Sequence, residues 1–190
     1  MIRVLTGVWM MVLAGPSMAL ELCDELWFGR NLVFDQAGYC FGSPLGKVVF
    51  DNADCTTNNP EISSQDRAYV AWLKEIEAEW QCEIDTTQTR LSVALPDVRQ
   101  RLVNRVAPSP YESACVGWSG QQIALLAGHG TQHEVIGYAQ AGDDIHWEND
   151  WQDAPQGWEF LTVKRRDGVT YAMGWSNVFI DAAYCEMMAG

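Results

Sequence analysis

Hydrophobic residues recur at helical spacing in the first half of the chain. One helical face carries Tyr69, Trp72, Leu73, Ile76 and Trp80. Because Ser63 or Ser64 can cap the first turn of this segment, we expect an amphipathic helix here.

Two earlier segments also predict helices. Ser43 and Pro44 are typical of a cap followed by a first turn, and the hydrophobic residues behind them have one-sided spacing. Asp24 can cap a still earlier helix, which Gly38 ends. Residues 23–82 are therefore expected to form three helices.

After Ala114 the pattern changes to short alternating runs broken by glycine. The runs cover residues 123–127, 134–138, 145–147, 158–163 and 171–175. Short strands of this kind predict a small β-barrel. Between the two halves the pattern is weaker: residues 91–95 alternate like a short strand, and residues 97–106 predict a helical turn or two before Pro108 and Pro110.

Residues 26–41 resemble the YARHG domain, a small extracytoplasmic helical module. The resemblance rests on the Leu26-Trp27 start, the Arg30-Asn31 pair and the Gly38-Tyr39-x-Phe41 end. Residues 35–37 replace the Tyr-Ala-Arg-His core that names the family, so no role of that Arg-His is transferred. We expect Arg30 and Asn31 to bond loop carbonyls and fix their helix against residues 51–62, with a small-ligand site as the alternative.

The second half resembles a bacterial SH3-like domain. The matching segments are Leu125–Thr131, Glu134–Gly137, Gly157–Val163 and Gly174–Ile180. The resemblance implies a small barrel that binds peptide or cell-wall ligands and is rarely catalytic. The expected fold class is α+β, with a disulfide-bonded three-helix module at residues 20–82, a partly ordered connector at 83–114 and an SH3-like β-barrel at 115–190.

The N-terminus resembles a secretory signal peptide. Arg3 precedes an apolar run from Val4 to Ala14, and small residues at Ser17 and Ala19 suit a cleavage site. The run is too short to span a bilayer. We therefore expect residues 1–19 to be removed, leaving a periplasmic or secreted protein without a membrane span.

The six cysteines predict three disulfides. An even number of cysteines without a Cys-x-x-Cys pair is typical of a structural framework in an oxidising compartment. Cysteines at the ends of neighbouring elements suggest the pairs Cys23–Cys82, Cys40–Cys55 and Cys115–Cys185.

The negative net charge of the chain limits the kinds of partner that it can bind. The chain has 25 acidic and 12 basic side chains and a net charge of −13, which argues against nucleic acid. Four arginines, Arg90, Arg99, Arg101 and Arg105, lie between the two halves. We expect them to dock on acidic neighbours within the chain, with a contact patch for an acidic partner as the alternative.

Catalytic and metal-binding motifs are scarce. His129 and His133 have a spacing that suits zinc on a helix, but the glycines around them predict a turn, so no metal site and no cofactor are expected. No nucleophile or phosphate-loop motif occurs, and we expect no enzymatic activity. If the protein is instead a cell-wall hydrolase, Asp35 with Glu25 or Asp51 is the candidate carboxylate pair.

An acidic and aromatic stretch follows Gly142. We predict a ligand surface made of Tyr138, Asp143, Asp144, Trp147, Asp150, Trp151 and Tyr171. Aromatic rings supply contact area and carboxylates attract cations, so a basic or proline-rich peptide would suit it; a solvated hairpin is the alternative. The expected function is non-catalytic binding of a protein, peptide or peptidoglycan ligand. A hydrolase accessory protein and an accessory subunit of an envelope complex are two further hypotheses.

Overall fold

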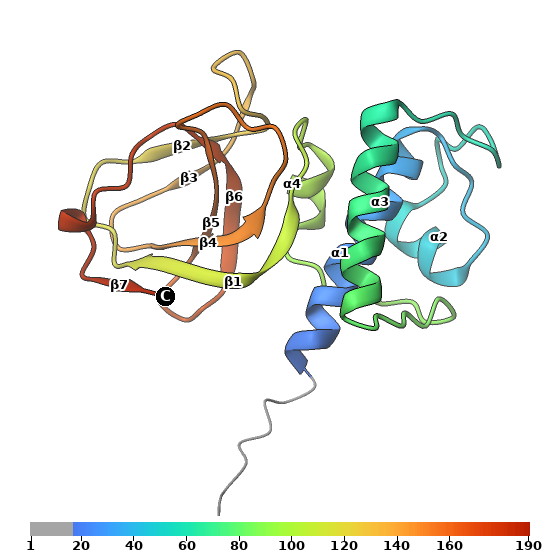
Figure 1. Cartoon of the computed structure of the whole chain (residues 1–190), viewed down its shortest axis with the longest axis horizontal. Helices are drawn as coiled ribbons and strands as arrows, with labels where there is room; N and C mark the ends of the chain where they lie inside the picture. Colours follow the sequence, from blue (N-terminus) through green and yellow to red (C-terminus); the bar gives the residue numbers. More distant parts are fainter. Residues whose placement is uncertain (1–16) are drawn as a thin grey trace, which may run out of the picture.

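The computed structural model of the chain describes residues 17–190 (Figure 1). The expected signal peptide lies outside the described residues, apart from residues 17–19, which belong to the first helix. Among the described helices, none is both long enough and apolar enough to cross a membrane.

Three helices form the first half, as the hydrophobic spacing predicted. They are α1 (Ser17–Gln36), α2 (Pro44–Phe50) and α3 (Ser64–Glu79). The Ser43 hydroxyl accepts a hydrogen bond from the backbone N–H of Gly46, and the Ser63 hydroxyl accepts one from Asp66. Each serine thereby satisfies a backbone donor in the first turn of its helix.

The start of α1 differs from the prediction. The helix begins before Asp24, so Asp24 is not its cap. The Asp24 carboxylate accepts a hydrogen bond from the backbone N–H of Ser92 instead, at 2.8 Å. At the other end, Gly38 follows the helix with a φ of +78°, a conformation that glycine adopts without strain.

Aromatic side chains fill the core between α1 and α2. Phe50 stacks on Phe28 with ring centroids 5.4 Å apart and on Phe41 with centroids 4.7 Å apart. Leu91 and Val93 pack against this cluster from outside the helices. Residues 91–95 were predicted to be a strand, but they form none: the side chains of Leu91 and Val93 cover the helical core, and the backbone of this segment pairs with no strand.

The second half is one antiparallel sheet. Its strands are β1 (Ala107–Val116), β2 (Ile123–Leu126), β3 (Val135–Ala139), β4 (Asp144–Asp150), β5 (Glu159–Lys164), β6 (Thr170–Ser176) and β7 (Met187–Ala189). A short 3₁₀ helix, η1 (Ala182–Tyr184), precedes β7. The strand order is β3-β2-β6-β5-β4-β1-β7, so β3 and β7 are the edges. All five predicted strands are present, but the sheet is not closed, so an SH3-like barrel is not confirmed.

Strand β1 was missed from the sequence. Pro108 and Pro110 were interpreted as breakers, yet Pro108 pairs with Asn149 of β4. The register shifts between Pro108 and Ser113, and this irregularity accommodates the prolines within the strand. The sheet therefore begins at Ala107 and not at Cys115, and the preceding helical turn is α4 (Pro96–Gln100).

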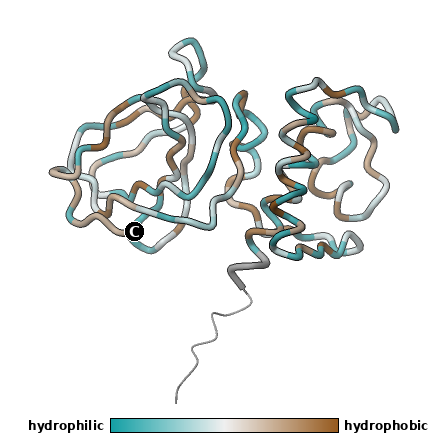
Figure 2. The backbone as a smooth tube through the Cα atoms, viewed as in Figure 1, coloured by the Kyte–Doolittle hydropathy of each residue, from teal (hydrophilic) through white to brown (hydrophobic). Residues whose placement is uncertain are grey.

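The sheet packs hydrophobic residues on both faces. One cluster includes Ile123, Leu125, Ile145, Leu161 and Val163. The other contains Phe160, Met173 and Trp175, and it is covered by Leu102, Val106 and the half-buried Leu95 and Val98 of the connector. Figure 2 shows hydrophobic residues in the segment between the sheet and the helices, so this segment is a packed layer.

Three disulfides join the pairs expected from the sequence. They are Cys23–Cys82, Cys40–Cys55 and Cys115–Cys185. The first ties α1 to the residues after α3, and the last ties β1 to the residues before β7. Each disulfide joins two cysteines of the same half, and none links the helical half to the sheet half.

Polar contacts join the connector to its neighbours. Arg99 is buried and forms an ion pair of 3.0 Å with Glu25 of α1. Arg105 bonds the carboxylate of Asp66 on α3, and Arg101 reaches Glu134 near the start of β3 at 3.2 Å. These pairings bear out the expectation of docking on acidic neighbours for three of the four arginines, whereas Arg90 is exposed and makes no ion pair among the described residues.

Candidate functional site

The predicted ligand residues divide into two groups. Tyr138, Asp143 and Tyr171 form the first group, because the Tyr171 phenol donates a hydrogen bond to the Asp143 carboxylate and lies 3.5 Å from the backbone oxygen of Tyr138. Burial and the neighbouring Asp143 raise the pKa of Tyr171. Since Tyr171 is committed to this bond, Tyr138 is the exposed ring of the group.

Asp144 has a structural contact. Its carboxylate accepts a hydrogen bond of 2.7 Å from the backbone N–H of Gly117 and lies 4.0 Å from Arg166. Gly117 has a φ of +64°, so Asp144 holds the turn that follows β1.

The second group lines a hollow beside β4, which we name the tryptophan hollow. It has a volume of about 240 Å³ and is lined by Ser109, Trp147, Asn149, Asp150 and Trp151. Trp147, Asp150 and Trp151 are predicted ligand residues that the fold brings together; Ser109 and Asn149 were not predicted.

Both indoles of the tryptophan hollow are half-buried and fixed. The indole N–H of Trp147 donates a hydrogen bond of 2.8 Å to the Glu159 carboxylate. The ring of Trp151 packs edge-on against buried Trp175, with centroids 5.5 Å apart. Because each ring is anchored on one side, its position is set before a ligand arrives.

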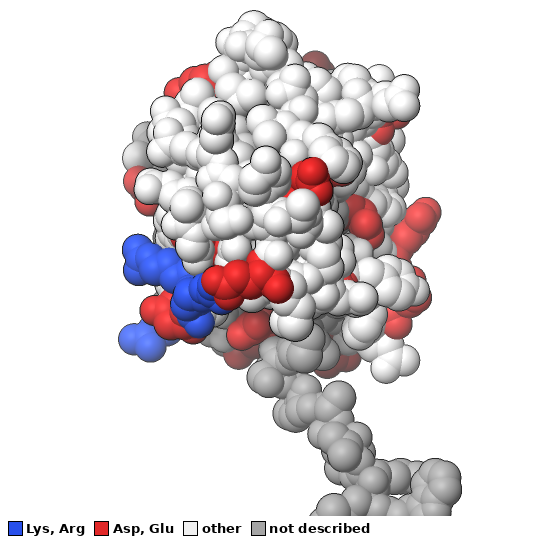
Figure 3. Space-filling view, turned by 90° about the vertical axis from the view of Figure 1, so that its left-hand side faces the viewer, with Lys and Arg blue, Asp and Glu red and all other residues white. Residues whose placement is uncertain are grey.

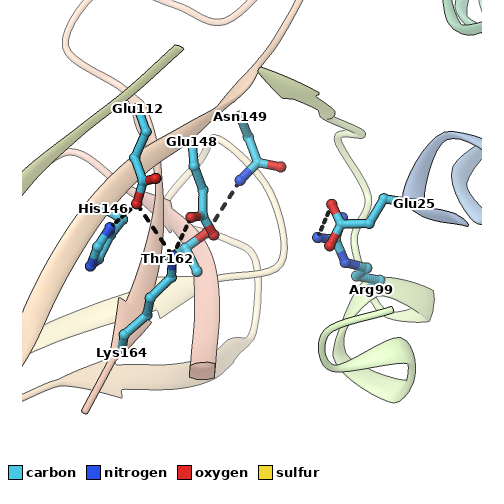
Figure 4. Close-up of polar contacts among 8 residues, drawn as sticks. All are labelled: Glu25, Arg99, Glu112, His146, Glu148, Asn149, Thr162 and Lys164. Carbon is cyan, nitrogen blue, oxygen red and sulfur yellow. Dashed lines mark hydrogen bonds and ion pairs between the residues drawn. The ribbon is translucent and has the colours of Figure 1, made fainter. Parts of the chain in front are cut away.

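Asn149 contributes a buried polar group to the hollow. Its side-chain amide donates to the Thr162 hydroxyl at 3.2 Å, and in Figure 4 its oxygen points away from Thr162. That oxygen is buried and has no hydrogen-bond partner among residues 17–190. A buried acceptor without a donor is uncommon and needs an explanation, such as a water molecule or a ligand.

A charged network covers the sheet where β1, β4 and β5 meet. Glu112, His146 and Glu148 place one potential metal-ligand atom each within 4.8 Å of the others. The Lys164 ammonium bonds Glu112 at 3.3 Å and Glu148 at 2.6 Å in the same place (Figure 4). Burial lowers the pKa of Lys164, but these two carboxylates outweigh that effect, and the pKa is raised. Lys164 thus supplies the positive charge, and a cation would have to displace it.

A second cavity lies between the two halves, and we name it the interdomain cleft. Its volume is about 380 Å³. Gln65 and Trp72 line it from α3, Arg105 from the connector, and His129 and Asp153 from the sheet half. Sequence reasoning missed it because these residues are far apart in the chain, and no local pattern indicates that the fold will join them.

The histidines are not arranged as a metal pair. The His129 ring packs edge-on against Trp175 with centroids 5.2 Å apart, whereas the His133 ring contacts Gln132 at 3.1 Å.

The two candidate partners of Asp35 differ, because Glu25 is engaged elsewhere whereas Asp51 lies near Asp35. Glu25 is bound to Arg99, and burial raises the pKa of Glu25 despite that pairing (Figure 4). Asp35 lines an open depression together with Asp54. Burial and the negative charges of Asp54 and Asp51 raise the pKa of Asp35.

The polar pair of α1 has other partners than we expected. Arg30 forms an ion pair of 3.0 Å with Glu77 on α3, and the Asn31 amide donates to the backbone oxygen of Trp27 at 2.8 Å. Neither side chain hydrogen-bonds residues 51–62. Asn52 fixes that loop instead, because its side chain bonds both the N–H and the carbonyl of Phe41.

Comparisons with known protein families match both halves. The YARHG domain matches residues 11–78, which supports the resemblance seen in the N-terminal half. Residues 81–190 match a domain of unknown function, DUF4453, and the resemblance to SH3-like domains found no family match. Comparison with curated proteins and with solved structures found no match. Since the second match covers more than half of the sequence, the chain belongs to the DUF4453 family, with a YARHG domain ahead of the family region.

Proposed function

We propose that the protein is a non-catalytic extracytoplasmic binding protein that recognises a basic peptide segment in the tryptophan hollow. One observation carries the proposal: Trp147, Asp150 and Trp151 line a single hollow, which also contains a buried acceptor without a partner among the described residues. The three disulfides and the YARHG domain support a place outside the cytoplasm.

The chemistry of the hollow suits a cation. The faces of indole rings attract ammonium and guanidinium groups, and Asp150 adds an exposed carboxylate. Within the part of the chain that the structure describes, no lysine or arginine lines the hollow. A guanidinium or ammonium group entering it would offer N–H donors, which the amide oxygen of Asn149 can accept.

The charge of the whole chain supports the same ligand class. The net charge of −13 attracts cationic partners over long range and speeds their encounter. Figure 3 shows the face at the sheet end of the molecule, where basic side chains gather in one place beside acidic ones and acidic side chains are scattered elsewhere. Among the basic residues of the sheet half, Arg166 is paired with Glu186 at 2.5 Å.

Two finer features belong to this proposal. The first is export by the leader at residues 1–19 to the periplasm or the exterior. The second is an SH3-like arrangement of the sheet, which short glycine-separated strands around one hydrophobic cluster support. The basic segment can belong to a protein partner or to the peptide stems of the cell wall.

Binding measurements on the oxidised protein test the proposal. We expect an arginine- and lysine-containing peptide to bind with saturation, and the same peptide with citrulline and acetyl-lysine to bind at least about tenfold more weakly. Trp147→Ala and Asp150→Asn should reduce binding, whereas Trp80→Ala, on an exposed ring at the end of α3, should not. Co-sedimentation of the protein with purified cell wall tests where the basic segment comes from. Binding to the wall would assign the segment to the peptide stems, and its absence would assign it to a protein partner. Equal affinity for the charged and neutral peptides would contradict the proposal.

The second candidate function, an accessory subunit of an envelope complex, rests on a different surface. Hydrophobic side chains are exposed near the C-terminus: Val178, Phe179, Tyr184, Met187 and Met188. Phe179 is 84% exposed, and exposed apolar clusters often mark interaction sites. If this surface docks on a complex, Phe179→Ser should shift the protein from a high-mass fraction of envelope extracts to the monomer position, and Trp147→Ala should not.

A further inference from the structure

We infer that the interdomain cleft binds a neutral saccharide. This site is separate from the tryptophan hollow, and the inference does not depend on the proposed peptide binding. The cleft volume of about 380 Å³ lies within the range of small-ligand pockets, which often form where two domains meet.

Several polar side chains of the cleft are free to bind. Gln65 and Gln152 are exposed, and within residues 17–190 neither amide side chain makes a hydrogen bond. The Asp153 carboxylate and the ring nitrogens of His129 likewise have no hydrogen-bond partner in the described part of the chain. An amide group presents a donor and an acceptor in one plane, and a carboxylate presents two acceptors; both arrangements match the adjacent hydroxyl groups of a sugar ring.

Trp72 supplies an apolar surface among these groups. Its indole is half-buried on α3, and the ring of Tyr69 supports it edge-on with centroids 6.1 Å apart. A pyranose ring has an apolar C–H face and a rim of hydroxyl groups. An aromatic surface beside these amides and a carboxylate therefore complements both parts of the sugar.

The charges of the cleft disfavour an anionic ligand. The one arginine among the described residues of the lining, Arg105, bonds the Asp66 carboxylate and the Gln36 side-chain oxygen. Its positive charge is thereby compensated, and the Asp153 carboxylate gives the lining an excess of negative charge. A phosphate or carboxylate ligand would meet repulsion here, whereas an uncharged hydroxyl group would not.

Arg105 also has one donor without a partner. Its Nε–H is buried and makes no hydrogen bond within the described residues. A buried donor left unpaired costs free energy. An oxygen atom placed beside it, from a water molecule or a ligand, would satisfy it.

The binding experiment uses the full oxidised protein and soluble neutral tetrasaccharides. Isothermal titration with tetramers of N-acetylglucosamine, glucose with β-1,4 linkage and glucose with α-1,4 linkage should show saturable binding of at least one. Gln152→Ala and Asp153→Asn should each weaken that binding about fivefold to fiftyfold, which corresponds to about 1–2 kcal/mol for a hydrogen bond. Both residues are exposed, so the folded structure should tolerate these changes.

Matched controls separate the cleft from the rest of the surface. Trp72→Ala should abolish binding, whereas Trp80→Ala, at the end of the same helix, and Gln88→Ala, an exposed amide elsewhere, should leave it unchanged. Trp147→Ala, which impairs the tryptophan hollow, should retain saccharide binding. Absence of saturable binding to all three tetrasaccharides would overturn the inference, and so would equal losses in the cleft and control variants.

Discussion

The phenol of Tyr69 donates a hydrogen bond of 2.8 Å to the backbone oxygen of Val106. Tyr69 lies buried on α3, and Val106 immediately precedes β1, so this bond joins the helical half to the sheet half. Together with the bonds of Arg105 to Asp66 and Gln36, it holds the backbone that enters the sheet against the helices.

Loss of this bond should destabilise the protein. Tyr69→Phe leaves the buried carbonyl of Val106 without its donor, and we expect the free energy of unfolding to fall by about 1–3 kcal/mol. Urea unfolding followed by circular dichroism measures the change. Tyr111→Phe is the control, because that ring is 82% exposed and its substitution should change stability by less than about 0.5 kcal/mol.

The same tyrosine predicts a loss of stability at alkaline pH. Burial raises the pKa of Tyr69 from 10.0 to about 12. Between these values the folded state keeps a proton that the unfolded state has released, so stability falls as the pH rises. Tyr171, whose pKa is also raised, adds to the slope. Unfolding free energies measured across this range should fall less steeply in Tyr69→Phe than in the wild type; an unchanged slope would contradict the assignment.

The ion pair of half-buried Glu25 and buried Arg99 predicts an asymmetric response to mutation. Arg99→Met leaves a half-buried carboxylate without its partner, and we expect a loss of about 2 kcal/mol. Glu25→Gln should cost less than half of that, because burial already disfavours the charged form of Glu25 and the glutamine oxygen can still accept from Arg99.

Acid should partly rescue the arginine variant. Burial raises the pKa of Glu25 from 4.5, and removal of Arg99 should raise it further. Protonation then neutralises the buried group, so the deficit of Arg99→Met should shrink as the pH falls toward 4.5. A deficit that stays constant over that range would show that lost packing, and not charge, is responsible.

The disulfides should differ in their contribution to stability. Cys115 and Cys185 are 70 residues apart, and Cys40 and Cys55 are 15 apart. Because a cross-link restricts the unfolded chain more when the loop is longer, the double alanine variant of the first pair should lose about 4 kcal/mol and that of the second about 3 kcal/mol. Thermal unfolding of both double variants under identical oxidising conditions gives the order. The opposite order would contradict the loop-length argument.

The cap of α3 discriminates between two neighbouring serines. Ser63 accepts a hydrogen bond from the backbone N–H of Asp66 at 3.0 Å, whereas Ser64 lies inside the helix. Ser63→Ala should cost about 1 kcal/mol, and Ser64→Ala should be neutral or slightly stabilising. Denaturant midpoints of the two variants measure this difference, and equal losses would reject Ser63 as the cap.

Local signals predicted most of the fold. The Ser43-Pro44 start of α2 and the alternating residues of β2 could be identified because the cap and the periodicity lie within a few residues. Strand β1 could not, because what stabilises Pro108 in a strand is its distant partner Asn149 in β4. Leu91 and Val93 alternate as in a strand, yet the helices they cover decide their conformation.

The candidate sites also divide into features set by neighbouring residues and features set by distant ones. Trp147, Asp150 and Trp151 lie close together in sequence, so their common hollow could be predicted in part. The separation of Asp143 and Tyr171 from that hollow could not, since it depends on how β4 and β6 lie in the sheet. The interdomain cleft needs residues from α3 and from the segment after β4, and only the docking of the halves brings Trp72 and Asp153 together.

The connector, residues 83–114, limits which parts of the chain can fold as separate fragments. The boundary between the two family matches, at residues 78 and 81, lies ahead of the connector. A fragment cut there would leave the helices without the cover of Leu91 and Val93, and the sheet fragment would expose Arg99 and Arg105 without their carboxylate partners. The two family regions are thus separable as sequences, but because they share these contacts we expect them to unfold together in one transition.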